Sequence, residues 1–165
     1  MDRSLEIIDI VKKNPGIKFR EIMRESGLKN GVLSYHTRKL EENGSVKINR
    51  KSGETRFYPL CITDEESNVI TSLRRDTQRH ILMSLLDDES LTFNEIVQKV
   101  KKAPSTVSTF LGKLVDDDIV GIKITELKKI YFLRNADMVH EIIEKYNPLL
   151  LERTAYNLAD TFSNL

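Results

Sequence analysis

The sequence has little of several features that would each assign it to a broad class of protein. It holds a single cysteine, Cys61, which excludes an internal disulfide and any zinc site that needs several cysteines. No apolar run approaches the roughly 18–20 residues that span a bilayer, and the N-terminus lacks the apolar core of a signal peptide. We therefore expect an intracellular, cytoplasmic protein from a reducing compartment, with no membrane partner.

An excess of one charge is also missing. The 165 residues carry 26 Lys and Arg against 25 Asp and Glu, a formal net charge of +1. A strongly basic chain is the simplest sign of a nucleic-acid partner, and this chain is not one. The charge is unevenly distributed, however: residues 1–60 carry a net +5, residues 61–134 a net −1 and residues 135–165 a net −3. An anionic partner is therefore expected to contact the N-terminal part of the chain.

Signals for catalysis or a bound metal are scarce. There is no glycine-rich phosphate loop, and His140–Glu144 begins like a zinc-protease motif but lacks the second histidine. Cys61 could act as a redox sensor only if it were exposed and activated, and we expect it to be buried at the end of a strand. The sequence therefore predicts no enzyme activity, no cofactor and no metal.

The chain contains a diverged internal repeat. An offset of 74 positions places residues 7–48 on residues 81–122 without a gap, with nine identical pairs. Random pairing at this composition would give about two or three identities. Apolar residues also match at core-like spacing, for example Ile8 with Leu82 and Val11 with Leu85. We infer two copies of one small fold.

Copy 1 is predicted to contain three helices followed by a hairpin. Apolar spacing and helix-breaking residues indicate helices over about Ser4–Lys13, Phe19–Glu25 and Asn30–Glu42. A turn-rich stretch lies between Val46–Ile48 and Phe57–Tyr58, which is typical of a strand, a turn and a second strand.

Copy 2 is predicted to repeat this order. A helix is expected over Thr77–Leu86, and Thr92–Glu95 is a capping box that opens the next one. Pro104 suits the first position of a third helix, because its missing N–H costs nothing there. Ile119–Thr125 and Lys129–Leu133 are expected to form the hairpin.

The predicted fold is mainly α with small β-hairpin wings: two tandem winged helix-turn-helix domains plus C-terminal helices. We expect a first domain over residues 1–62, a connecting helix over 63–75, a second domain over 76–134 and a C-terminal helical segment over 135–165. In a winged helix-turn-helix, the third helix enters the major groove and the hairpin wing reaches flanking phosphates.

Several segments resemble known regulators of this fold. Pro15–Ile22 and Gly31–Gly44 look like archaeal winged-helix transcriptional regulators. Leu73–Leu82 and Ala103–Ser108 are similar to the ArsR/MarR-like side of the same superfamily, and the likeness continues into Tyr146–Leu150. The resemblance implies a tandem winged-helix transcriptional regulator that binds double-stranded DNA and dimerises through terminal helices. Some ArsR relatives sense metals with several Cys or His ligands, which this sequence does not offer.

The candidate DNA contacts of copy 1 lie on the outer face of its third helix, at the entrance of that helix, or on the wing. They are Lys29, Asn30, Ser34, Tyr35, Arg38, Lys39, Arg50, Lys51 and Arg56. Arg38 suits a bidentate contact with guanine or a phosphate. His36 and Thr37 align with Phe110 and Leu111, so they are expected to face inward or half inward, with packing the favoured role of His36 and DNA contact its alternative.

The candidates in copy 2 form a weaker set for a second DNA contact. They are Ser105, Ser108, Thr109, Lys113, Lys128 and Lys129. Gly112 stands where copy 1 has Arg38, and three consecutive carboxylates, Asp116–Asp118, would repel a DNA backbone. Packing, dimerisation or partner binding is therefore almost as plausible a role for copy 2.

The C-terminal segment has apolar stripes on two predicted helices, Ala136–Tyr146 and Pro148–Phe162. In the second helix the stripe consists of Leu151, Ala155, Leu158 and Phe162. Such a stripe must be buried against its own domain or another chain, and a homodimer interface is the favoured interpretation.

The alternative to a DNA-binding regulator is a winged-helix module in a protein-interaction or chromosome-associated scaffold that does not recognise DNA sequence.

Overall fold

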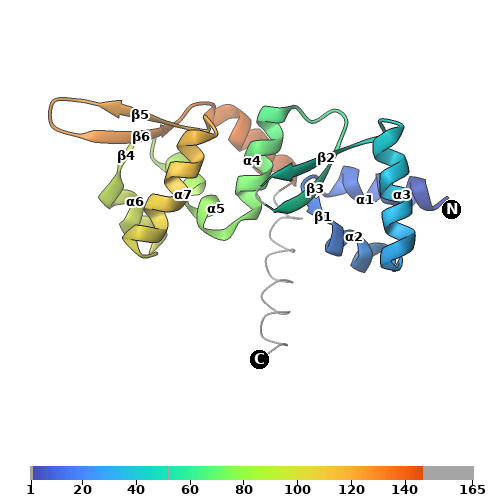
Figure 1. The fold of residues 1–165 in the computed structure, drawn as a ribbon. Coiled ribbons are helices and arrows are strands. Elements are labelled where there is room, and N and C mark those ends of the chain that lie inside the picture. The colour runs from blue at the N-terminus through green and yellow to red at the C-terminus, as the bar shows by residue number, and fades with distance from the viewer. Residues whose placement is uncertain (1, 52, 147–165) are drawn as a thin grey trace. The chain divides into compact units, whose positions relative to one another are not determined.

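The computed structural model describes residues 2–51 and 53–146, and the chain divides into two compact units, Met1–Ser67 and Asn68–Leu165. The elements of each unit are labelled in Figure 1. Among the described residues, no helix has the length and apolar character needed to cross a membrane.

Unit 1 contains three helices and a three-stranded antiparallel sheet (Figure 1). Its elements are α1 (Arg3–Lys13), β1 (Ile17–Lys18), α2 (Phe19–Ser26), α3 (Asn30–Glu42), β2 (Val46–Lys51) and β3 (Glu54–Pro59), and α4 (Asp64–Arg74) begins within it. The strand order is β1-β3-β2, so β3 is the central strand. Strands β2 and β3 form the first wing.

Unit 2 has the same order of elements. They are α5 (Asp76–Asp87), β4 (Leu91–Thr92), α6 (Phe93–Val100), α7 (Pro104–Asp116), β5 (Val120–Ile124) and β6 (Lys129–Leu133), followed by helical residues 136–146. Its sheet has the order β4-β6-β5, and β5 and β6 form the second wing. The prediction of a mainly helical protein with two small wings is confirmed.

The internal repeat is structural. The offset of 74 positions carries β1, α2 and α3 onto β4, α6 and α7 with the same boundaries. The buried residues also correspond. The pairs include Ile7 and Ile81, Ile22 and Ile96, Leu33 and Val107, Leu40 and Leu114, and Phe57 and Tyr131. Each unit therefore buries one core built from equivalent positions.

Two strands were missed by the sequence prediction, which expected simple hairpins. Strands β1 and β4 have two residues each, too few to show an alternating pattern. They form through long-range pairing: Ile17 lies opposite Phe57, and the Gly16 N–H donates to the Phe57 carbonyl at 2.8 Å. Each sheet thus gains a third strand that covers the outer edge of the wing's second strand.

Two sharp turns in each copy need backbone in the left-handed region. Gly27, which ends α2, has φ +70°, and Gly44, after α3, has φ +73°. The equivalent residues in unit 2 are Lys101 at φ 58° and Asp118 at φ 57°. Glycine adopts this region without steric cost, whereas a residue with a side chain adopts it at a steric cost. The turn geometry is therefore kept in both copies although the glycines are not.

Cys61 is exposed, so the prediction of a buried strand-end cysteine is wrong. Strand β3 ends at Pro59, and the Ile62 N–H donates to the Pro59 carbonyl at 3.2 Å. This turn buries Ile62 and leaves Cys61 outside. In helical residues 136–146, Val139 and Ile142 are buried. The dimerisation residues Leu151, Ala155, Leu158 and Phe162 lie outside the described residues.

Candidate nucleic-acid interface

Helix α3 has one buried face and one exposed face. Leu33, Thr37 and Leu40 are buried, which fixes the orientation of the helix in unit 1. On an α-helix, residues three and four apart lie on the same side, so Gly31, Tyr35 and Arg38 follow one exposed line opposite the core. Arg38 forms no hydrogen bond or ion pair with another described residue. Its guanidinium donors are therefore available to a partner.

The first turn of α3 presents small polar groups. Asn30 and Ser34 are exposed, and the Ser34 hydroxyl donates to Asn30 Oδ1 at 3.1 Å. Lys29 is the N-cap residue, and its side chain makes no capping hydrogen bond. Backbone N–H groups at a helix N-terminus attract anions, and a neighbouring lysine strengthens that attraction.

Tyr35 is 47% exposed, and its ring contacts two neighbouring side chains. The His36 ring meets it edge-on with centroids 5.3 Å apart, and Lys39 Nζ lies 5.2 Å from its centroid. His36 is half-buried and its Nδ1 lies 3.4 Å from the Ser4 hydroxyl, which supports the packing role favoured for this histidine. Tyr35 thus offers an oriented ring and hydroxyl, with a cation beside it.

An ion pair joins α3 to the first wing. The Arg50 guanidinium donates to both carboxylate oxygens of Glu41, at 2.8 and 2.7 Å. This hydrogen bonding lowers the pKa of the Glu41 carboxyl below its ordinary value and raises the pKa of Arg50. Arg50 and Lys51 are both exposed on β2. The pair therefore positions wing cations beside the end of the helix, and a bidentate arginine pair also fixes geometry.

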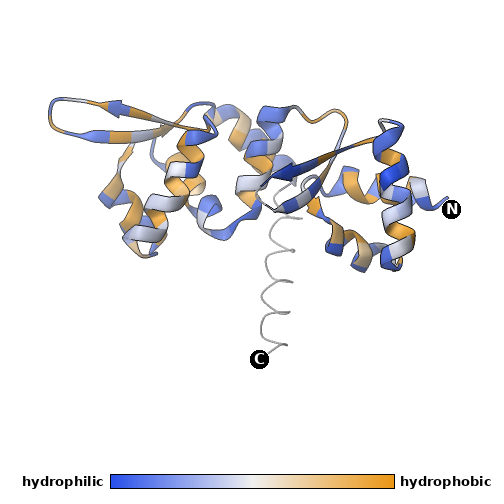
Figure 2. Ribbon diagram, in the orientation of Figure 1, coloured by the Kyte–Doolittle hydropathy of each residue, from blue (hydrophilic) through white to orange (hydrophobic). Residues whose placement is uncertain are grey.

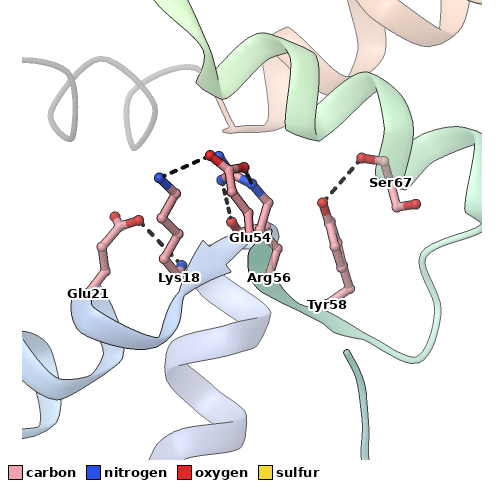
Figure 3. Close-up of polar contacts among 7 residues, drawn as sticks. Lys18, Glu21, Glu54, Arg56, Tyr58 and Ser67 are labelled. Carbon is pink, nitrogen blue, oxygen red and sulfur yellow. Dashed lines mark hydrogen bonds and ion pairs between the residues drawn. The ribbon is translucent and has the colours of Figure 1, made fainter. Parts of the chain in front are cut away.

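Arg56 is buried, so it does not lie on the surface of the first wing, where its predicted DNA contact would need it. It is only 5% exposed, its Nη1 donates to the Gly16 carbonyl at 2.8 Å, and its Nε lies 3.2 Å from Glu54 (Figure 3). Glu54 also pairs with Lys18 of β1 at 3.4 Å. Because β1 covers the edge of β3, Arg56 lies in the middle of the sheet and not on its rim. Its guanidinium stabilises the fold of unit 1.

Helix α7 of unit 2 presents a different exposed line. Ser105, Thr109 and Gly112 stand where α3 has Gly31, Tyr35 and Arg38. The Thr109 hydroxyl donates to the Ser105 carbonyl at 3.0 Å, and Lys113 lies 5.3 Å from the Phe110 ring centroid. Ser108 and Lys113 are exposed as predicted. The line carries no positive charge and ends at the exposed Asp116–Asp118 run.

The second wing is apolar at its tip. Ile124 is 78% exposed and Leu127 is 92% exposed. At the equivalent positions the first wing has Arg50 and Gly53. Lys128 and Lys129 are exposed beside this tip, and Lys129 Nζ lies 5.6 Å from the Tyr131 ring centroid. Figure 2 shows the contrast: the outer part of β2 is hydrophilic, whereas β5 and β6 carry hydrophobic bands.

Within the described ranges, no group of three or more His, Cys, Asp or Glu side chains is arranged to hold a metal ion. The polar side chains on the exposed line and first turn of α3 are cations, a hydroxyl, an amide and a phenol. Such groups bind phosphates and base edges by hydrogen bonds and charge. The arrangement is suited to binding.

Two family descriptions match this chain. A family described as an N-terminal HTH domain matches residues 1–70, and the bacterial regulatory protein, arsR family, matches residues 75–121. The chain carries two helix-turn-helix domains. These are families of transcriptional regulators and not of enzymes. The two matches fall on the two copies of the repeat, in agreement with the tandem fold.

Individual relatives are distant. The chain is 24% identical over 135 residues to a protein described as "Uncharacterized HTH-type transcriptional regulator MJ1398" of Methanocaldococcus jannaschii; the match covers 82% of this chain and 34% of that protein. Among solved structures, the transcriptional repressor BigR from Xylella fastidiosa is 20% identical, with 51% of this chain and 85% of that chain covered and a TM-score of 0.45. An S. aureus MepR–DNA complex is 19% identical, with coverages of 88% and 96% and a TM-score of 0.39.

Proposed function

We propose that this protein is a sequence-specific DNA-binding transcriptional regulator in which α3 enters the major groove and the first wing holds flanking phosphates. The observation that carries the proposal is the pairing of two exposed features in unit 1. Tyr35 and Arg38 lie on the open line of α3, and the Glu41–Arg50 ion pair ties that helix to the cations of the wing. A groove-reading helix beside a phosphate-binding hairpin is the geometry that this function needs.

The proposal gives each residue a role. Arg38 contacts a guanine edge through its two parallel donors. Asn30, Ser34 and Tyr35 donate hydrogen bonds to bases or phosphates, and Lys29 holds a phosphate at the helix N-terminus. Lys39 and Lys51 contribute positive charge along the backbone. Arg50, whose charge is paired with Glu41, holds the wing beside α3 for contact with the DNA. Arg56 is excluded because it is buried.

The domain boundaries and the assembly belong to the same proposal. We assign the DNA-binding function to residues 1–62, a connecting role to 63–75, a second winged helix to 76–134 and a C-terminal segment to 135–165. A homodimer would present two α3 helices to half-sites about 34 Å apart, or a multiple of that spacing. A protein that acts on DNA in this way works inside the cell, in the cytoplasm.

Binding measurements with two variants test the proposed roles. Arg38→Ala should weaken binding to a DNA site selected from a random pool by about 1–3 kcal/mol and affect random DNA less, because a base contact is lost. Lys51→Ala should weaken binding to both DNAs by similar amounts, because only a phosphate contact is lost. The slope of log Kd against log salt concentration should fall by about one. Fluorescence anisotropy over a salt series measures both effects.

Lys13→Ala, which removes an exposed cation at the end of α1, is the matched control and should change neither affinity. Equal losses on selected and random DNA for Arg38→Ala would remove Arg38 from its base-contacting role. If no DNA is bound even at low salt, the protein-interaction scaffold becomes the better description.

Unit 2 supports that second candidate role for its own part of the chain. Its wing tip is apolar and the exposed line of α7 is uncharged, which suits a protein partner or a second copy better than a phosphate backbone. Ser105, Ser108, Thr109, Lys113, Lys128 and Lys129 therefore remain a weaker set of DNA contacts in this proposal. Replacing Lys128 and Lys129 by Ala should change the salt dependence of DNA affinity only if the second wing contacts DNA.

A further inference from the structure

We propose that the first turn of α3 contains a subsite for the 5-methyl group of a pyrimidine, formed by Gly31, Val32 and the ring of Tyr35. This subsite rests on the proposed function, because it lies on the face of α3 that is proposed to enter the major groove. It adds an apolar contact to a surface that otherwise offers hydrogen bonds and charge. Thymine is the unmodified base that presents such a methyl group in that groove.

Val32 is an exposed apolar residue on a helix that buries its other aliphatic side chains. It is 44% exposed, whereas Leu33 and Leu40 are buried in the core of unit 1. A β-branched residue loses rotamer freedom in a helix, and an exposed one recovers little of that cost by packing. Contact with an apolar group outside the protein would recover it.

Gly31 has no reason within the protein to be glycine. It is the second residue of α3, its backbone is not in the left-handed region, and a Cβ added to it would meet nothing within 4 Å. Glycine is less favourable than alanine inside a helix. The remaining physical use of a missing side chain is close approach of another molecule to the backbone. Gly31 lies on the outward line of α3, where DNA would approach.

Tyr35 closes the subsite on its C-terminal side. It is four residues from Gly31 and three from Val32, so all three are neighbours on the helix surface. The contacts of its ring with His36 and Lys39 hold it in place before any ligand arrives. These three residues are the proposed apolar seat.

The second copy lacks this seat. Its equivalents of Gly31, Val32 and Tyr35 are Ser105, Thr106 and Thr109, which all carry hydroxyl groups. Helices α3 and α7 have equivalent boundaries and bury equivalent positions, so these three residues differ from their counterparts in side-chain chemistry and not in their place on the helix. The apolar seat is thus a property of the first recognition helix and not of the fold.

The test removes single methyl groups from DNA. Starting from a site selected from a random pool, each thymine is replaced in turn by deoxyuridine, and Kd is measured by fluorescence anisotropy. We expect one thymine in each half-site at which the loss of the methyl group weakens wild-type binding about fourfold, the effect of exposing one apolar carbon. DNA with 5-methylcytosine at that position should also bind more tightly than DNA with cytosine there. This comparison tests the effect of the methyl group independently of the rest of the base.

The protein variants complete a double-mutant cycle. Val32→Ser should reduce the ratio of affinities for thymine-containing and uracil-containing DNA from about four to about one. Gly31→Leu should do the same by filling the seat. Leu60→Ser, at an exposed apolar residue outside α3, should leave the ratio at about four. Thermal unfolding should show Gly31→Leu at least as stable as wild type, because leucine favours helix more than glycine does and a Cβ at this position meets nothing within 4 Å.

A site without any methyl-sensitive thymine, or an unchanged fourfold ratio in Val32→Ser, would overturn the subsite and leave the proposed function standing. Failure to recover any preferred DNA site would overturn the proposed function, and the subsite with it.

Discussion

The two halves of this protein share a fold and differ on their surfaces. The exposed line of α3 carries Tyr35 and Arg38, and the same line of α7 carries Thr109 and Gly112. The wing of unit 1 exposes Arg50 at the position where the wing of unit 2 exposes Ile124. The apolar core positions largely correspond between the two units, whereas these exposed positions do not. Fold identity between two copies therefore does not imply a shared partner.

The link between recognition helix and wing differs in the same way. In unit 1 it is the ion pair of Glu41 and Arg50, and in unit 2 the equivalent residues are Val115 and Ile124. A strand position within each sheet follows the same pattern: unit 1 has the buried Arg56, and unit 2 has the half-buried Ile130. Unit 1 thus uses charge both inside its sheet and at its surface, where unit 2 uses aliphatic side chains.

The largest stability effect is expected from Arg56→Ala. Removing this buried guanidinium leaves the Gly16 carbonyl without its donor and Glu54 with less positive charge beside it, so unfolding should become easier by about 2–3 kcal/mol. Urea denaturation of the full chain measures the loss. Arg50→Ala, on the exposed face of the same wing, is the control and should cost under about 1 kcal/mol. Similar losses in both variants would contradict the assignment of Arg56 to the fold.

A gain of stability is expected from Gln78→Met in unit 2. Gln78 is buried, and its Oε1 finds no hydrogen-bond partner among the described residues. Its equivalent in unit 1 is Ser4, whose hydroxyl lies beside His36, and the equivalent of His36 is Phe110, which has no polar atom to offer. Replacing the amide by a side chain of similar shape should stabilise the protein by about 1 kcal/mol.

Chemical denaturation followed by circular dichroism measures that gain. Gln98→Met, at an exposed position of α6, is the control and should change stability by under about 0.5 kcal/mol. Destabilisation by Gln78→Met would mean that the amide is satisfied in solution, and the contrast with Ser4 would then be lost.

The smallest effect concerns the pH dependence of the Glu41–Arg50 pair. Its hydrogen bonds lower the pKa of Glu41 in the folded state, so the pair stabilises the protein above the ordinary pKa of glutamate. This contribution is lost as pH falls through the lowered value, because the carboxyl is then protonated. NMR titration of the Glu41 carboxyl should show its midpoint move upward in Arg50→Ala and stay in place in Lys51→Ala. An unmoved midpoint in Arg50→Ala would show that the helix and the wing are not joined by this pair.

Much of the local structure was predictable from the sequence. The end of α3 follows from Asn43 and Gly44. Because unit 2 repeats the same pattern, its elements could be predicted in the same order. The orientation of α3 was also predictable, since aligning Thr37 with Leu111 identifies the inward face. Helical periodicity and turn residues are local signals, and they are strong for elements of this length.

The site was predictable only in part. Lys29, Asn30, Ser34, Tyr35, Arg38 and Lys51 are exposed where exposure was expected. Arg56 was misassigned because strand β1 was missed, and a strand of two residues carries no periodic signal. The exposure of Cys61 was missed for a related reason: a turn after Pro59, and not the strand itself, decides where that side chain lies.

By itself, the amino-acid sequence determined that this chain forms two copies of one winged helix-turn-helix plan, with positive charge concentrated in the first. Apolar spacing and turn residues act over a few positions, so these features can be predicted from short stretches of sequence. Only the tertiary structure decided which cations are available: the pairing of β1 with β3 places Arg56 inside, and the Glu41 carboxylate engages Arg50. Those outcomes depend on contacts between residues far apart in the chain. The identity of an arginine in the sequence does not show whether its guanidinium is buried, paired or exposed.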